Sequence, residues 1–108
     1  MKIEFDHVAV RSKDIQASIA FYKEHFDDVE VLYEDKTWGL IRAGGAKVAF
    51  VTAGEHPPHF SFSVRTKEEL VNYAAEMNGK IKVHRDRSES FYFKDPSDNA
   101  IEIVWYPE

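Results

Sequence analysis

The sequence predicts an α+β fold made of two similar modules, each with the order strand, helix and three strands. Several short segments alternate apolar and polar residues, which is typical of half-buried strands. Two other segments carry an apolar stripe at helical spacing. This order occurs in residues 1–54 and again in residues 59–108. Two such βαβββ modules side by side predict a curved mixed sheet of about eight strands, with the helices outside and a concave cleft.

The first module begins with an expected strand over residues 2–10. Ser12 and Asp14 are candidate N-caps for the helix that follows. Apolar residues recur at i, i+4, i+7 and i+11 along this helix, and they are Ile15, Ile19, Tyr22 and Phe26. Three further strands are expected, at residues 29–33, 38–42 and 47–52.

The second module follows a connector whose consecutive prolines, Pro57 and Pro58, cannot donate to a strand ladder. A strand is expected over residues 59–64, and its residues Phe60 and Phe62 are predicted to pack under a helix. Residues 66–69 read as a capping box. The helix stripe after it consists of Leu70, Ala74 and Met77, with Gly79 as the expected C′ residue. The last strands are expected at residues 80–84, 90–94 and 100–106.

The composition indicates one folded domain, 1–108, with a modest core. A net charge of −5 argues against nucleic acid or an anionic membrane surface as the main partner. The apolar stretches are much shorter than the roughly 20 residues that cross a bilayer, and the first residues lack the apolar core of a signal peptide. We therefore expect a cytoplasmic protein. The absence of cysteine excludes thiolate ligands, so any metal must be bound by nitrogen and oxygen.

Three ionisable residues lie within expected strands, and they are the best indication of function. His7 lies in the first strand, His59 begins the fifth, and Glu102 lies in the last. Because side chains alternate between the two faces of a strand, His59 shares a face with Ser61, and Glu102 lies opposite its apolar neighbours. An ionisable group at such a place must be solvated, paired or bound to metal. Two imidazoles and one carboxylate are a known divalent-metal set that leaves coordination positions open.

Four segments of the chain resemble the vicinal oxygen chelate superfamily, which includes glyoxalase I, extradiol catechol dioxygenases, fosfomycin-resistance thiol transferases and bleomycin-resistance proteins. These segments are His7-Val8-Ala9-Val10, residues 14–22, residues 59–64 and residues 91–103. The resemblance implies the glyoxalase/bleomycin-resistance/dioxygenase fold. It also implies metal ligands from the first, fifth and last strands, which match His7, His59 and Glu102. Glyoxalase I has a further acidic ligand on its fourth strand, and residues 47–52 contain no carboxylate. Glyoxalase I proper is therefore disfavoured.

Residues 84–93 look like the region that binds the phosphonate in fosfomycin-resistance transferases. The resemblance implies substrate-binding roles for His84, Ser88 and Tyr92. The chain departs from that pattern at Ala9, where the transferases have threonine. A dianionic substrate would therefore lack part of its usual binding site.

These observations favour a divalent-metal-dependent enzyme, a lyase or a dioxygenase, that chelates a small substrate through two adjacent oxygens. The expected cofactor is one Fe, Mn, Zn or Ni ion, which the ligand types do not distinguish. Two alternatives stay open: a metal-free binding protein of the bleomycin-resistance type, and a thiol transferase. The resemblance also implies a homodimer. No catalytic residue apart from the metal ligands is assigned.

Overall fold

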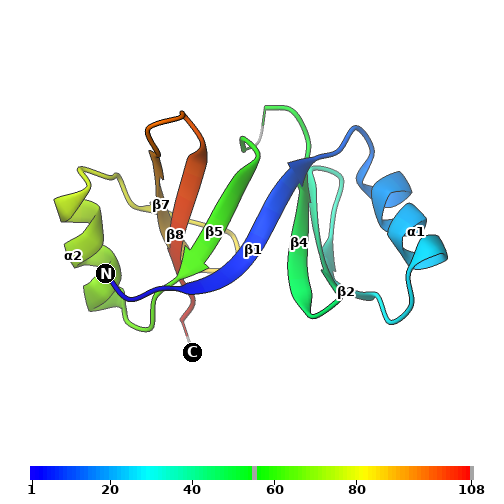
Figure 1. Ribbon diagram of the computed structural model, residues 1–108, viewed down its shortest axis with the longest axis horizontal. Helices are drawn as coiled ribbons and strands as arrows, with labels where there is room; N and C mark the ends of the chain where they lie inside the picture. The colour runs from blue at the N-terminus through cyan, green and yellow to red at the C-terminus, as the bar shows by residue number, and fades with distance from the viewer. Residues whose placement is uncertain (55, 108) are drawn as a thin grey trace. The chain divides into compact units, whose positions relative to one another are not determined.

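The computed structural model describes residues 1–54 and 56–107. In chain order the elements are β1 (Glu4–Arg11), α1 (Ile15–His25), β2 (Glu30–Glu34), β3 (Trp38–Ala43), β4 (Ala46–Val51), β5 (His59–Ser63), α2 (Lys67–Glu76), β6 (Lys82–Val83), β7 (Glu89–Lys94) and β8 (Ala100–Trp105) (Figure 1). The βαβββ order therefore occurs twice, and the predicted α+β class is confirmed. No helix among the described residues is long and apolar enough to cross a membrane.

The eight strands belong to one mixed sheet in the order β2-β3-β4-β1-β5-β8-β7-β6. β1 pairs with β4 in parallel, whereas the β2–β3, β3–β4, β6–β7 and β7–β8 pairs are antiparallel. The parallel pair is reached through α1 and two further strands, because parallel neighbours need a long crossover connection. In this order β8 lies between β5 and β7, so residues of both neighbours can reach the side chains of β8.

The chain divides into two compact units, which we call the 7–59 unit and the C-terminal unit. The first contains His7–His59, and the second contains Met1–Asp6 with the described residues from Phe60 onwards. In the 7–59 unit, α1 packs on strands β2, β3 and β4. Its core residues are Ile15, Ile19, Ile41 and Phe50. In the C-terminal unit α2 packs on β8, and the core residues are Val64, Leu70, Ala74, Phe91 and Ile103.

The helix N-termini follow the sequence closely. Asp14 is the N-cap of α1, and its carboxylate accepts a hydrogen bond of 3.2 Å from the N–H of Ala17. Ser12, the other candidate cap, is buried and its hydroxyl accepts a hydrogen bond from the N–H of Asp14. Thr66 caps α2 by accepting a hydrogen bond from the N–H of Glu69. A hydroxyl or carboxylate at the N-cap satisfies an N–H group that has no partner within the helix.

Two details of the second module differ from the predictions. Phe60 does not pack under a helix, since it is 49% exposed, whereas Phe62 packs against the core of the C-terminal unit. The strand predicted over residues 80–84 is limited to Lys82–Val83. It ends early because His84 already belongs to the following turn, where its N–H donates to the carbonyl of Ser88 and its carbonyl accepts from Arg87.

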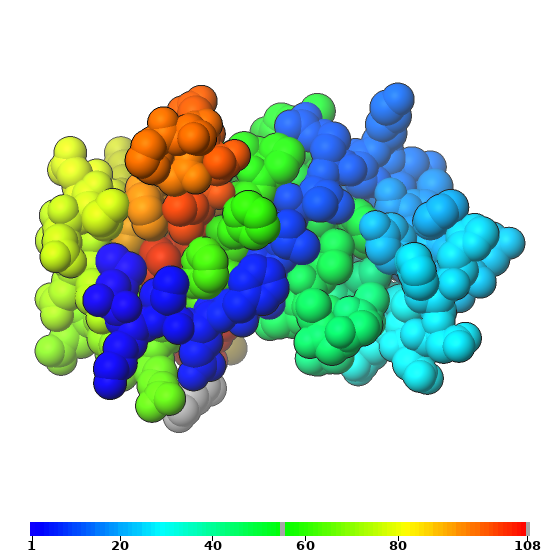
Figure 2. All heavy atoms as spheres, in the orientation of Figure 1, coloured from blue at the N-terminus to red at the C-terminus, as the bar shows by residue number. Residues whose placement is uncertain are grey.

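The turn between β7 and β8 is held by one aspartate. The carboxylate of Asp95 accepts hydrogen bonds from the N–H groups of Ser97 and Asn99 and from the Asn99 side chain. The Asn99 side chain is the main cause of the lowered pKa of Asp95. Asp98 adopts a left-handed φ of 69°, which aspartate tolerates. The turn is exposed and protrudes from the surface (orange in Figure 2).

The end of α2 also differs from the prediction. Met77 is the C-cap, so the C′ residue is Asn78, with a left-handed φ of 55°, and not Gly79. Asparagine adopts this conformation more readily than most residues. Gly79 is needed for another reason: a Cβ there would overlap the ring of Phe91, lying 3.0 Å from its Cγ. The glycine therefore allows the chain to pass close to the most deeply buried aromatic ring of this unit.

Gly79→Ala is expected to lower the free energy of unfolding by about 1–3 kcal/mol, because overpacking of a filled core displaces its side chains. Urea unfolding followed by circular dichroism measures the change. Asn78→Gly is the control, since glycine adopts the same φ without strain and stability should be equal or slightly higher. Wild-type stability of Gly79→Ala would contradict this account of the close contact.

Candidate metal centre

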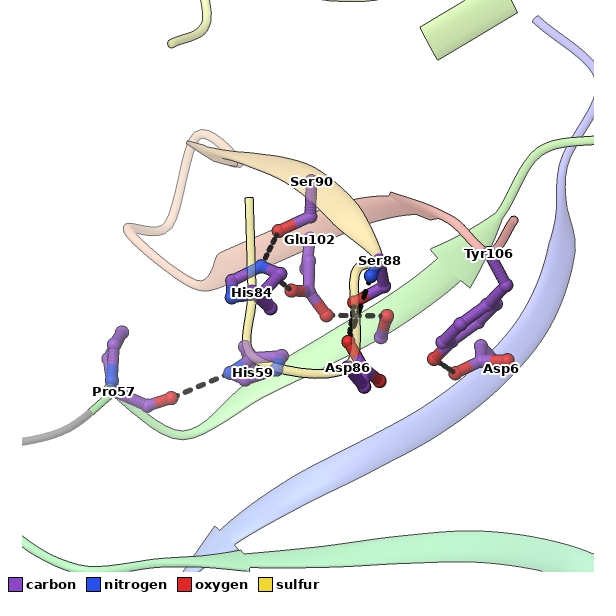
Figure 3. A network of polar contacts seen from close by, with 10 residues as sticks. Asp6, Pro57, His59, His84, Asp86, Ser88, Ser90, Glu102 and Tyr106 are labelled. Atoms are coloured by element: carbon purple, nitrogen blue, oxygen red, sulfur yellow. Dashed lines mark hydrogen bonds and ion pairs between the residues drawn. The ribbon is translucent and has the colours of Figure 1, made fainter. Parts of the chain in front are cut away.

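His7 and His59 form an edge-to-face pair in the 7–59 unit. Their ring centroids are 5.5 Å apart, and the ring planes are inclined by 71°. His59 is 6% exposed, and its Nδ1 lies 2.7 Å from the carbonyl oxygen of Pro57 (Figure 3). Because a carbonyl can only accept, Nδ1 carries the proton and donates it to Pro57. This hydrogen bond fixes the tautomer in which Nε2 has the lone pair, as for a histidine that ligates metal through Nε2.

Glu102 is buried in the middle of β8, at 5% exposure, and its carboxylate is surrounded by polar side chains. The Ser61 hydroxyl on β5 donates to Oε1 over 2.7 Å. Tyr92 stands at the paired position of β7, and its hydroxyl also donates to the carboxylate. His84 Nε2 lies 3.8 Å from Oε2. A buried carboxylate is stabilised by such donors, because losing water without replacement costs several kcal/mol.

His84 and Ser88, two of the predicted substrate-binding residues, have different surroundings. His84 Nε2 lies 2.6 Å from the hydroxyl of the fully buried Ser90, so this ring stands between Ser90 and Glu102 (Figure 3). The Ser88 hydroxyl donates to Asp86 over 2.6 Å, within the turn between β6 and β7. The structure therefore brings His84 and Tyr92 to Glu102, whereas the Ser88 hydroxyl is used to hold the turn.

The three predicted metal ligands lie close together. His7, His59 and Glu102 each offer one ligand atom, and these three atoms lie within 4.8 Å of one another. Two imidazole nitrogens and a carboxylate oxygen fit a divalent metal, and this cluster could bind one.

Four residues of this region, Ser61, Ser90, Asp6 and Tyr106, are not among the site residues that the sequence predicts. Alternation along the fifth strand places Ser61 on the face of His59, and this was the only available signal for its position. Ser90 precedes Tyr92 by two residues, so the same rule would place it on the face of Tyr92. Asp6 and Tyr106 are 100 residues apart, and the Tyr106 hydroxyl donates to Asp6 over 2.6 Å (Figure 3). No local pattern could indicate this pair.

Both tyrosines of this region stay neutral well beyond neutral pH. Burial is the main cause that raises the pKa of Tyr92, followed by the charge of Glu102 and the hydrogen bond to it. Burial also raises the pKa of Tyr106, and the charge and hydrogen bond of Asp6 add to the effect. Tyr106 as a whole is 38% exposed, but its hydroxyl is turned toward the buried Asp6. Both hydroxyls are therefore hydrogen-bond donors at neutral pH.

A pocket of about 380 Å³ in the 7–59 unit lies away from these residues. It is lined by residues 13–16, at the start of α1, and residues 34–36, in the β2–β3 turn. None of the predicted metal ligands or substrate-binding residues lines it. This pocket is therefore not part of the candidate centre.

Comparison with known proteins identifies the family. Residues 4–103 match the model of the Glyoxalase/Bleomycin resistance protein/Dioxygenase superfamily. The chain belongs to this superfamily. The match covers both modules of the chain and all three predicted metal ligands. No curated protein matches the sequence.

Solved structures of the superfamily fold are similar over almost the whole chain. Methylmalonyl-CoA epimerase from Mycobacterium tuberculosis has a TM-score of 0.73 at 13% identity, covering 97% of this chain and 89% of the epimerase. The Mn(II)-bound glyoxalase from Novosphingobium aromaticivorans has a TM-score of 0.71 at 17% identity, covering 94% of this chain and 38% of that protein. A variant of homoprotocatechuate 2,3-dioxygenase from Brevibacterium fuscum has a TM-score of 0.70 at 14% identity, covering 93% and 33%. At these identities the likeness shows the fold alone.

Tyr106→Phe is expected to make the stability less sensitive to alkaline pH. A raised folded-state pKa favours the neutral phenol, so its contribution is fully present below the unfolded pKa of about 10 and is lost as pH rises above it. Urea unfolding at about pH 7 and about pH 11 measures the difference. The variant should be less stable than wild type by about 1 kcal/mol at neutral pH, where it lacks the hydrogen bond to Asp6. An equal alkaline loss in both proteins would contradict the environment described for Tyr106.

Proposed function

We propose that this superfamily member is a divalent-metal-dependent enzyme in which His7, His59 and Glu102 bind one ion. The observation that supports the proposal best is the close approach of three ligand atoms of suitable chemistry, within 4.8 Å of one another. The hydrogen bond from His59 Nδ1 to Pro57 adds to it, because it presets the tautomer for a ligand nitrogen. Fe, Mn, Zn and Ni all suit two imidazoles and a carboxylate.

The proposed substrate is a small molecule that offers two adjacent oxygens. When bound, the metal supplies Lewis acidity toward substrate oxygens at the positions that the three protein ligands leave open. The Tyr92 hydroxyl donates its hydrogen bond to Glu102, so Tyr92 would contact the substrate through its ring or as a hydrogen-bond acceptor. His84 would contact the substrate beside Glu102, since its Nε2 lies 3.8 Å from Oε2. Ser88 would join them only if its hydroxyl turned away from Asp86.

The reaction class is proposed as a lyase or a dioxygenase. The structural relatives named above include an epimerase, a glyoxalase and a dioxygenase, so one fold supports several chemistries. A thiol transferase on a dianionic substrate is less well supported, because the hydroxyl of Ser88 already donates to a carboxylate. We also propose a homodimer, on the basis of the family resemblance.

A metal-free binding protein is the second candidate function. It is favoured by the surroundings of Glu102, whose carboxylate accepts hydrogen bonds from Ser61 and Tyr92 and lies near His84. These contacts stabilise a buried carboxylate in part without an ion. Metal content therefore discriminates the two functions more sharply than any substrate screen.

His7→Ala is expected to lose bound metal. Wild-type protein purified without chelator should contain about one divalent ion per chain, and the variant close to none, because one of three ligands is gone. Elemental analysis of both proteins measures the content and names the element. Circular dichroism checks that the variant is folded.

His25→Ala is the matched control, because His25 is exposed on α1 and its ring lies tilted against that of Phe21, with ring centroids 4.3 Å apart. It should retain the wild-type metal content. Equal metal in wild type and His7→Ala would reject His7 as a ligand. A wild-type protein that stays metal-free after incubation with Fe(II), Mn(II), Zn(II) and Ni(II) in turn would favour the binding protein.

A further inference from the structure

Two hydroxyls reach Glu102 from the strands on either side of it. β8 lies between β5 and β7 in the sheet. Ser61 on β5 has no exposed surface, and its hydroxyl donates to Oε1 over 2.7 Å. Tyr92 on β7 stands directly opposite Glu102 in the strand pairing, and its hydroxyl donates to the same carboxylate. The carboxylate is therefore held from both neighbouring strands.

We infer that Ser61 and Tyr92 are positioning residues that fix the orientation of the Glu102 carboxylate and so set the affinity for metal. The inference rests on the proposed function, in which Glu102 is a ligand. Without these donors, the terminal torsion of a glutamate is broad and roughly two-fold. The carboxylate would then have to be ordered when the metal binds, and affinity would fall.

Strand β5 carries both the positioning residue Ser61 and the proposed metal ligand His59. Side chains two residues apart point to the same side of a strand, so His59 and Ser61 share one side of β5. A single strand therefore supplies a ligand nitrogen and the hydroxyl that holds the ligand oxygen. Because His59 and Ser61 are two residues apart in the same strand, the extended backbone between them fixes their spacing. Ser63 continues the same side, is half-buried, and provides a comparison residue.

His84 and Ser90 have a different relation to the carboxylate. His84 Nε2 is 2.6 Å from the Ser90 hydroxyl but 3.8 Å from Glu102 Oε2, which is beyond the length of a hydrogen bond. Ser90 therefore positions the imidazole, whereas Ser61 and Tyr92 position the carboxylate. Removing the Ser90 hydroxyl should leave the orientation of Glu102 unchanged.

Metal titration of four proteins tests the inference. Metal-free wild type, Ser61→Ala, Tyr92→Phe and Ser63→Ala are titrated with Ni(II) alone in a calorimeter, and urea unfolding of each metal-free protein is measured in parallel. Ser61→Ala and Tyr92→Phe should each bind Ni(II) about 10–100-fold more weakly than wild type, the usual effect of losing a partner of a metal ligand. Ser63→Ala should bind with wild-type affinity.

The outcomes separate the inference from the proposed function. Wild-type affinity in Ser61→Ala and Tyr92→Phe would overturn the positioning role, while stoichiometric binding by wild type would keep the metal centre. A loss of unfolding free energy without a loss of affinity would also overturn it, because the hydroxyls would then only stabilise the fold. If Ser61→Ala does not fold, Tyr92→Phe decides alone, since it keeps the aromatic ring. A wild type that binds none of Ni(II), Zn(II), Mn(II) and Fe(II), each titrated in turn, overturns both.

Discussion

The burial of one carboxylate in the middle of a strand is the constraint on which the candidate centre depends. Glu102 is almost fully shielded from water, and an isolated carboxylate in such a place would cost several kcal/mol or become protonated. The carboxylate is stabilised by the hydroxyls of Ser61 and Tyr92 on the two neighbouring strands, and the imidazole of His84 lies nearby. A side chain that the fold surrounds so extensively is well defined in position, which is what a metal ligand requires.

A hydrogen-bond partner also fixes the second buried polar group of the centre, the imidazole of His59. His59 is buried, and the carbonyl of Pro57 determines which of its nitrogens carries the proton. The main-chain carbonyl of Pro57, two residues before His59, therefore orients the imidazole. The family identity agrees with this arrangement without fixing the chemistry, because the superfamily fold is shared by proteins with different reactions.

The sequence was informative wherever a local rule operates. Alternation located the strands, and it placed His59 and Ser61 on one side of β5, while cap chemistry located Asp14 and Thr66 at the helix starts. Prediction failed where tertiary packing decided the outcome. Gly79 is required by the ring of Phe91 and not by the helix end. Contacts between distant residues, such as the hydroxyl of Ser61 on Glu102, depend on the strand order, which alternation alone does not contain.

The hydrogen bond between Asp6 and Tyr106 has a consequence for how the chain acquires its structure. It joins residues 100 positions apart, one at the start of the first strand and the other just after the last. Contacts of such long separation form late, because the entropy of closing the loop must be offset by structure already in place. During synthesis on the ribosome, Tyr106 is added 100 residues after Asp6, so the hydrogen bond cannot form until then. We therefore expect this contact to form among the last steps of folding.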